Sequence, residues 1–230
     1  MTRTGGGVKR FSAVELLIAL GLFFAVTPFV EELPRGDLIE AVLLTVVFLS
    51  AVLAIGGRRR TYLIAVVLAV PAIVGKWLSH FRPDLIAPPI YLVAALVFGL
   101  FVIGHLQLFV LRARSVDSGV LCSAICAYLL MGLVWAFAYI LVTQLSPGSF
   151  SFNTSNTPKV VMDGFTAFYF SFSTQSTAGF GDITPVSKIA RMLAVMQATA
   201  GSLYLAILIA RLVGMYSPTH TNRPQSADRP

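Results

Sequence analysis

Residues 163–182 read DGFTAFYFSFSTQSTAGFGD, and the interpretation of the whole chain starts from this stretch. Its first part, Asp163 to Gln175, is apolar and rich in aromatic and hydroxyl side chains. At about 13 residues it is too short to cross a bilayer, which takes about 20. Pro158 and Asp163 are residue types that favour the start of a helix. We therefore predict a short re-entrant helix followed by a loop, Ser176 to Asp182.

Six further segments are long and apolar enough to cross a bilayer. Lipid offers the backbone no hydrogen bonds, so a spanning segment must be a helix or part of a closed barrel, and barrel strands would alternate in polarity. The sequence therefore predicts an all-α membrane protein with six transmembrane helices plus the re-entrant helix and its loop. The predicted spans are residues 11–30, 38–56, 61–80, 86–111, 118–145 and 188–216.

Composition supports a membrane protein and excludes other classes. Apolar residues make up 57% of the chain and charged residues 12%, with a mean hydropathy of +0.82, which is far from a soluble average. The net charge of +7 does not indicate nucleic-acid binding, because the basic residues lie between apolar segments. We expect membrane lipid as a partner and no nucleic acid. Cys122 and Cys126 lie one helical turn apart in a predicted span and are interpreted as ordinary apolar residues.

The charges between the spans predict the orientation. With the N-terminus in the cytoplasm, 11 of the 17 basic residues fall on the inner side, and the outer links hold acidic residues, as the positive-inside rule requires. Both termini are then cytoplasmic, and the loop that ends at Asp182 faces outward. The inner basic residues are Arg3, Lys9, Arg10, Arg58, Arg59, Arg60, Arg112, Arg114, Arg211, Arg223 and Arg229.

These features divide the chain into four regions. A cytoplasmic N-terminus, residues 1–10, precedes a four-helix membrane domain, residues 11–114. Residues 115–216 hold two spans around the re-entrant helix. The polar, proline-containing tail, residues 217–230, is predicted to be disordered and cytoplasmic.

The run from Thr177 to Asp182, Thr-Ala-Gly-Phe-Gly-Asp, resembles the selectivity filter of potassium channels, whose usual form is Thr-Val-Gly-Tyr-Gly-Asp. The order of span, short helix, motif and span is similar to the two-helix pore domain of that family, and six spans resemble its prokaryotic six-helix subunits. The resemblance covers about residues 118–216. The motif departs from the family at Ala178, where a β-branched residue is usual, and at Phe180, where tyrosine is usual.

The resemblance implies a homotetramer, because in that family four chains surround one axis and their carbonyl oxygens replace the hydration shell of potassium. Three further copies of the chain and potassium ions are therefore expected partners. Consecutive carbonyls can face one axis only if the backbone alternates in handedness, and left-handed positions favour glycine, which fits Gly179 and Gly181. Asp182 would lie at the outer mouth and concentrate cations there. The potassium-binding residues implied are Thr177, Ala178, Gly179 and Phe180.

The resemblance also implies residues that support the filter. Tyr169 and Phe170 resemble the aromatic residues that brace the filter from the short helix, and Ser173 is assigned to the same role. Packing into neighbouring helices would give the same sequence, so both interpretations of the aromatic pair stay open.

The last span carries the predicted inner cavity. Gly201 lies midway along it, where many relatives carry a hinge glycine, and a close-packing glycine fits equally well. The helical period places Leu205 and Ile209 on the face of Gly201. Together with Ser202, these residues are predicted to line the cavity.

The fourth predicted span carries no arginine or lysine before Arg112 and Arg114 at its inner end. A voltage sensor needs several such charges within the span, since each charge that crosses the field contributes about 2.3 kcal/mol per 100 mV. We therefore expect no strong voltage gating.

The expected function is passive potassium conduction in the plasma membrane, or in the inner membrane of a bacterium, without a cofactor. No enzyme is expected, because motifs such as His-Glu-x-x-His or Gly-x-Ser-x-Gly do not occur in the sequence. A weakly selective or non-selective cation channel is the main alternative, since Ala178 thins the packing behind the carbonyls. A potassium transporter fits less well, because such transporters carry four helix-pore-helix units in one chain.

Overall fold

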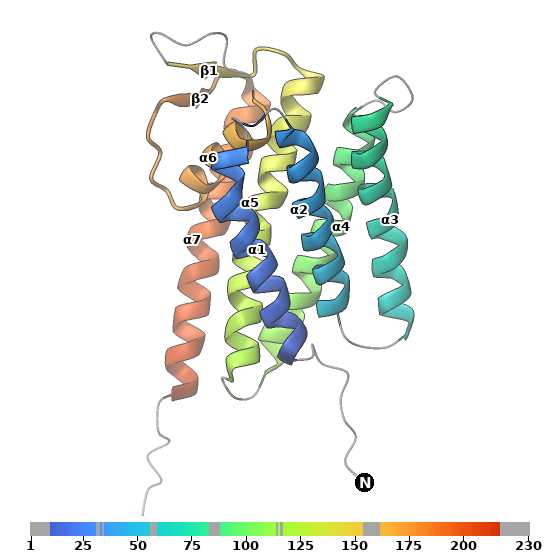
Figure 1. Ribbon diagram of the computed structural model, residues 1–230. Coiled ribbons are helices and arrows are strands. Elements are labelled where there is room, and N and C mark those ends of the chain that lie inside the picture. Colours follow the sequence, from blue (N-terminus) through green and yellow to red (C-terminus); the bar gives the residue numbers. More distant parts are fainter. Residues whose placement is uncertain are drawn as a thin grey trace, which may run out of the picture.

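The computed structural model describes residues 10–30, 33, 35–55, 59–82, 88–113, 115, 117–153 and 162–216. This part of the chain forms an all-α membrane protein of seven helices with one small sheet (Figure 1). Six of these helices are long and apolar enough to cross a membrane. The helices are α1 (Arg10–Val30), α2 (Gly36–Ala54), α3 (Arg59–Phe81), α4 (Pro88–Arg112), α5 (Ser118–Leu145), α6 (Gly164–Gln175) and α7 (Lys188–Tyr216).

The predicted helices are confirmed. Each of the six spans begins and ends within two residues of its predicted limits, and α6 covers the predicted re-entrant helix. Asp163 caps α6 as expected, because its carboxylate accepts a hydrogen bond from the Thr166 amide at 3.1 Å. Residues 1–9, Pro158 and the tail from residue 217 lie outside the described residues, so the predictions made for them stay predictions.

Helices α1 to α5 form one bundle with a shared apolar core (Figure 1). Both α1 and α4 pack directly against α5, and α4 makes the larger contact. In the core, the Phe48 ring of α2 meets Phe98 of α4 edge-on at 5.2 Å and Phe137 of α5 at 6.5 Å, measured between ring centroids. The first four helices therefore form one bundle with the α5 of their own chain, α3 through its contacts with α2 and α4, which the sequence did not predict.

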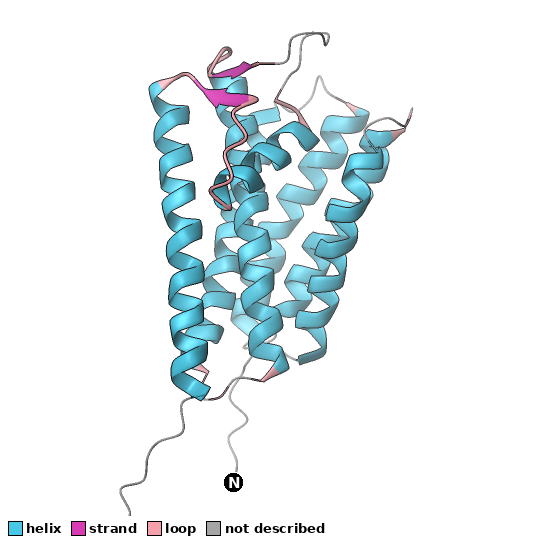
Figure 2. Cartoon of the chain, turned by 90° about the vertical axis from the view of Figure 1, so that its left-hand side faces the viewer, coloured by secondary structure: helices cyan, strands magenta, loops and turns pink. Residues whose placement is uncertain are grey.

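The short helix α6 is held between α1, α5 and α7. Phe24 of α1 contacts two rings of α6, Phe168 at 4.8 Å and Phe172 at 5.0 Å between centroids. On the α5 side, a Cβ at Gly132 would lie 2.3 Å from the Phe172 ring, so only glycine leaves room there. These contacts fix α6 in the half of the bundle where α1 ends and α2 begins (Figure 1). The two short strands lie at the same end of the bundle (Figure 2).

A two-stranded antiparallel sheet joins the segments before and after α6. Strand β1 (Phe150–Phe152) pairs with β2 (Ile183–Pro185), with Ser151 opposite Thr184. The sequence analysis predicted an all-α fold and no strand in either segment. Strands of three residues are too short to show an alternating pattern, and these two lie about thirty positions apart, so no local signal reveals them.

Candidate functional site

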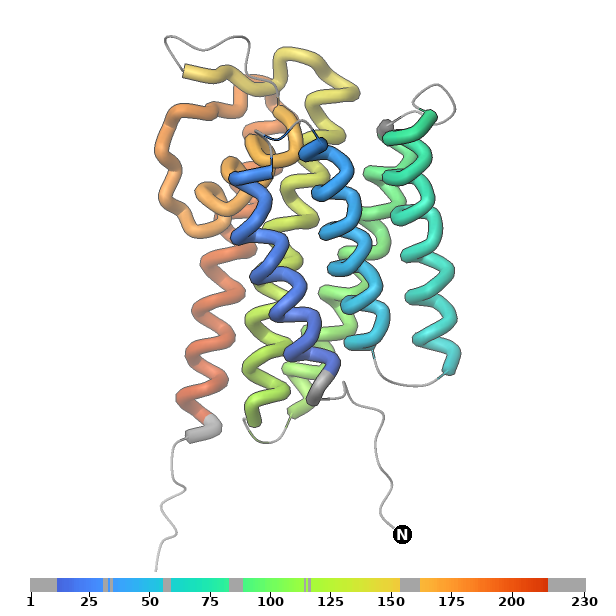
Figure 3. Tube along the Cα trace, viewed as in Figure 1, coloured from blue at the N-terminus to red at the C-terminus, as the bar shows by residue number. Residues whose placement is uncertain are grey.

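The candidate site is the loop that returns from the end of α6. The chain turns back at Ser176 and runs outward along the side of the bundle to β2 and the start of α7 (Figure 3). Two amides of the loop, those of Ala178 and Gly179, donate to the carbonyl of Ser173 at 2.9 and 3.3 Å. The loop is thereby anchored to the last turn of α6 through its N–H groups.

The carbonyls of the loop have a different environment from its amides. Within the described part of the chain, the carbonyls of residues 177–180 accept no hydrogen bond, and the loop is exposed from Ser176 to Asp182. The Phe180 side chain is 69% exposed. The single chain therefore presents a row of backbone oxygens that are available to a ligand.

Backbone handedness alternates along the loop. Thr177, Gly179 and Gly181 have φ values of 59°, 54° and 81°, whereas the residues between them have negative φ. The two glycines have the left-handed conformation that the sequence analysis expects. Thr177 also adopts the left-handed conformation, although its Cβ makes this conformation costly. Among the described residues, Thr177 is the one non-glycine residue with a positive φ.

Tyr169 lies against the loop. Its ring stacks on Phe180 with a centroid distance of 5.9 Å and an interplanar angle of 9°. Partial burial, together with its hydrogen bond to the Asp182 carboxylate and the charge of that carboxylate, raises the pKa of the Tyr169 hydroxyl. The hydroxyl thus lies where it can donate to Asp182, the predicted outer-mouth residue.

The other two predicted support residues face inward from α6. Phe170 packs edge-on against Tyr139 and Phe150, with centroid distances of 4.8 and 5.4 Å. Ser173 is buried, and its hydroxyl donates to the Phe170 carbonyl at 3.0 Å, while its own carbonyl holds the loop. Ser173 thus touches the loop directly, whereas Phe170 fixes α6 against α5 and β1.

A buried polar network behind the loop was missed by the sequence analysis. The Gln197 amide of α7 donates to the Ser171 hydroxyl at 2.7 Å and to the Gln175 amide oxygen at 3.3 Å. Its own oxygen accepts from the Tyr139 hydroxyl at 2.6 Å. The Gln175 amide also donates to the Tyr128 carbonyl at 2.9 Å. Two glutamines within the apolar region were the available signal, because polar side chains in a membrane interior are costly unless they are paired.

The four predicted cavity residues of α7 divide into two groups. Gly201 is buried, and a Cβ there would lie 2.5 Å from the carbonyl oxygen of Gln175. Ser202, Leu205 and Ile209 are exposed on the single chain. Close packing against α6 therefore accounts for the glycine, while the other three residues lie on a face that is open in one chain.

Comparison with known proteins agrees with this arrangement. Residues 123–217 match the family model described as an ion channel, a match that takes in α6, the loop and α7 with most of α5. No curated protein and no solved structure matches the chain. The C-terminal part of this membrane protein is therefore similar to ion channel domains, and the first four helices lie outside the match.

Proposed function

We propose that the protein is a potassium-selective channel formed by four copies of the chain, with the loops Thr177 to Asp182 lining one central pathway. The observation that carries the proposal is the loop itself, whose alternating backbone exposes carbonyl oxygens without hydrogen-bond partners in the described chain. Irregular backbone at membrane depth is stable only where it meets protein or water, never lipid. A central axis shared by several copies satisfies that requirement.

Four copies match the chemistry of potassium. Rings of backbone carbonyls can replace its hydration shell, and one chain supplies one strand of such a ring. Potassium would bind at the carbonyls of residues 177–180, with the Thr177 hydroxyl at the inner end. The exposed apolar face of α7 supports assembly, because it offers a surface for neighbouring copies around the axis. No cofactor and no enzyme chemistry enter this proposal.

We place this channel in the plasma membrane, or the inner membrane of a bacterium, with both termini cytoplasmic. The filter then lies at the outer face. The absence of arginine and lysine in the sequence of the fourth span before Arg112 supports a channel without strong voltage gating.

A weakly selective cation channel is the second candidate, and the small side chain of Ala178 favours it. One measurement separates the two: the reversal potential of the purified protein in a planar bilayer, with potassium on one side and sodium on the other. A value near the potassium equilibrium potential supports the selective channel, and a clear current that reverses near zero supports the weakly selective one. Native mass spectrometry in detergent tests the assembly, and any mass other than that of a tetramer overturns it.

A further inference from the structure

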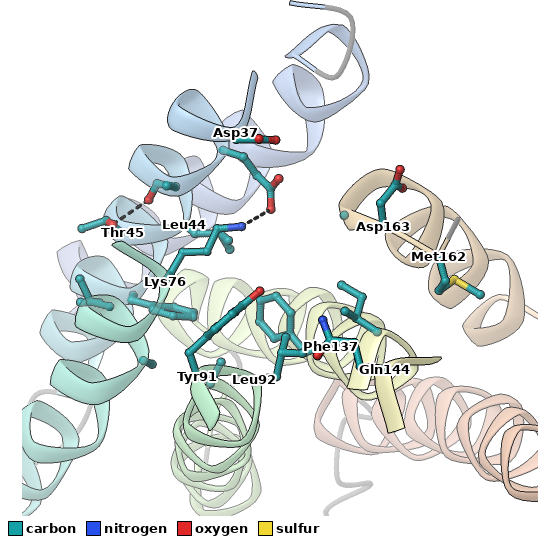
Figure 4. Close-up of a pocket in the computed structure, with 18 of the residues that line it drawn as sticks. Asp37, Leu44, Thr45, Lys76, Tyr91, Leu92, Phe137, Gln144, Met162 and Asp163 are labelled. Carbon is teal, nitrogen blue, oxygen red and sulfur yellow. Dashed lines mark hydrogen bonds and ion pairs between the residues drawn. The ribbon is translucent and has the colours of Figure 1, made fainter. Parts of the chain in front are cut away.

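A cavity of about 500 Å³ lies between helices α2 to α5 and the start of α6. It opens at the end of the bundle where α2 begins, and its walls come from α2, α3, α4, α5 and the first residues of α6 (Figure 4). A volume of this size is typical of small-molecule sites, which span about 300–1,000 Å³. The cavity lies apart from the candidate filter and uses none of its residues.

The deep part of the cavity is apolar. Leu44, Phe48, Leu92 and Phe137 line it, and all four are buried. Such walls suit a hydrocarbon or aromatic body, since removing apolar area from water contributes about 25 cal/mol per Å².

The mouth of the cavity is polar and carries an excess of negative charge. Three carboxylates, Asp37, Glu40 and Asp163, line it with one ammonium group, Lys76. Lys76 pairs with Glu40 at 3.2 Å, which leaves Asp37 and Asp163 without a cationic partner among the described residues (Figure 4). The Tyr91 side chain extends toward the open centre of this mouth (Figure 4).

We propose that this cavity binds an amphipathic organic cation, with an ammonium head at the carboxylates and an apolar body against the walls formed by Leu44, Phe48, Leu92 and Phe137. The unbalanced carboxylates attract a cation, and the Tyr91 ring at the mouth adds a favourable cation–π contribution. The same charge repels the phosphate of a phospholipid headgroup, which separates this ligand from the lipid that surrounds the protein.

The cavity borders the first turn of α6. A Cβ placed on Gly164 would lie 3.1 Å from a carboxylate oxygen of Glu40, so the Glu40 side chain rests against the first residue of the helix. A cation held at Glu40 and Asp163 therefore also contacts the helix that carries the loop. Any effect of this ligand on current rests on the proposed function, whereas its binding does not.

Binding is tested on the full chain in lipid nanodiscs by isothermal titration calorimetry with three matched probes. The probes are 4-phenylbutylammonium, 4-phenyl-1-butanol and 4-phenylbutyrate, which share one body and differ in head charge. We expect saturable binding of the ammonium, with the alcohol at least about tenfold weaker, a factor that corresponds to 1.4 kcal/mol, and no binding of the carboxylate.

Variants then locate the site. Asp37→Asn and Asp163→Asn should each weaken ammonium binding several-fold, and asparagine keeps the helix cap at residue 163. Asp117→Asn is the matched control, because Asp117 caps α5 in the same way and does not line the cavity. Ala95→Leu should weaken the ammonium and the alcohol alike by filling the cavity. Thermal unfolding of each variant verifies folding.

Three outcomes overturn the proposal. Equal binding of the ammonium and the alcohol would show that the site binds the apolar body and does not select a positive charge. If both Asp variants and Ala95→Leu leave ammonium binding unchanged, the ammonium binds outside this cavity. No saturable binding of the ammonium would exclude this class of ligand. A normal potassium current together with any of these results would leave the proposed channel intact.

Discussion

Helices α5 and α7 are both long and apolar, but their surroundings differ. Both are long apolar helices of the matched ion channel domain, yet half of the apolar stretch of α5 is buried inside the chain and only 17% of that of α7. α5 packs against α1, α4 and α6, whereas α7 touches the bundle mainly at α6 and α5. Lipid can cover an apolar helix, but it cannot solvate the exposed loop between α6 and α7. The difference supports the proposal that one half of the molecule is complete within a chain, whereas the other half contacts further copies.

The largest expected effect concerns the exposed loop. Gly179→Ala should abolish potassium flux, because φ at residue 179 is 54° and a Cβ there is strained. Gly148→Ala is the matched control, since Gly148 has a φ of 83° in the turn after α5, with open space for a Cβ. The control should cost about 1 kcal/mol of stability and keep the flux. Flux is measured in proteoliposomes, and equal flux in both variants would remove Gly179 from the pathway.

A second pair of substitutions compares the exposed face of α7 with the exposed outer face of α3. Leu205→Trp should lower the single-channel current several-fold, because the larger side chain would narrow the predicted cavity. Val67→Trp is the control, since Val67 of α3 is 67% exposed on the outside of the bundle. It should leave the current unchanged. Equal currents in the two variants would mean that the α7 face at residue 205 also meets lipid.

A third substitution tests the contact through which α7 joins the rest of the chain. Gln197→Leu leaves the Tyr139 hydroxyl and the Ser171 hydroxyl without Gln197 as their partner. Loss of a partner for a buried polar group costs about 1–3 kcal/mol. The melting temperature in detergent should therefore fall, whereas Met196→Leu on the exposed neighbouring position should not change it. A melting temperature that Gln197→Leu leaves intact would mean that water replaces the glutamine.

The sequence predicted most of the part that is complete within one chain. A membrane-spanning helix must be long enough to cross the bilayer and apolar along its length, and both properties can be read directly from the sequence. Each predicted helix end therefore lies within two residues of the observed end. The alternating glycines also predicted the left-handed backbone conformation of the loop at residues 179 and 181. Local patterns carry both kinds of information.

Contacts between distant segments could not be predicted in this way. The pairing of β1 with β2, the Glu40–Lys76 ion pair and the network at Gln197 each join residues that are more than twenty positions apart. The left-handed conformation of Thr177 was not predicted for another reason, because threonine as a residue type does not indicate a positive φ.

The smallest expected effect concerns the outer end of the loop. Tyr169→Phe removes the hydrogen bond to Asp182 and keeps the stacking on Phe180, and because the hydroxyl is open to water the expected loss of stability is below about 1 kcal/mol. The raised pKa of Tyr169 gives the sign of a pH effect: the stabilisation is present below the ordinary tyrosine pKa and is lost as the pH rises through the higher pKa of the folded protein. The melting temperatures of the unmodified protein and of Tyr169→Phe, measured from pH 8 upward, should therefore converge. A difference that persists at the highest pH would assign the effect to packing rather than to the bond, and the loop would then depend on Tyr169 only through its ring.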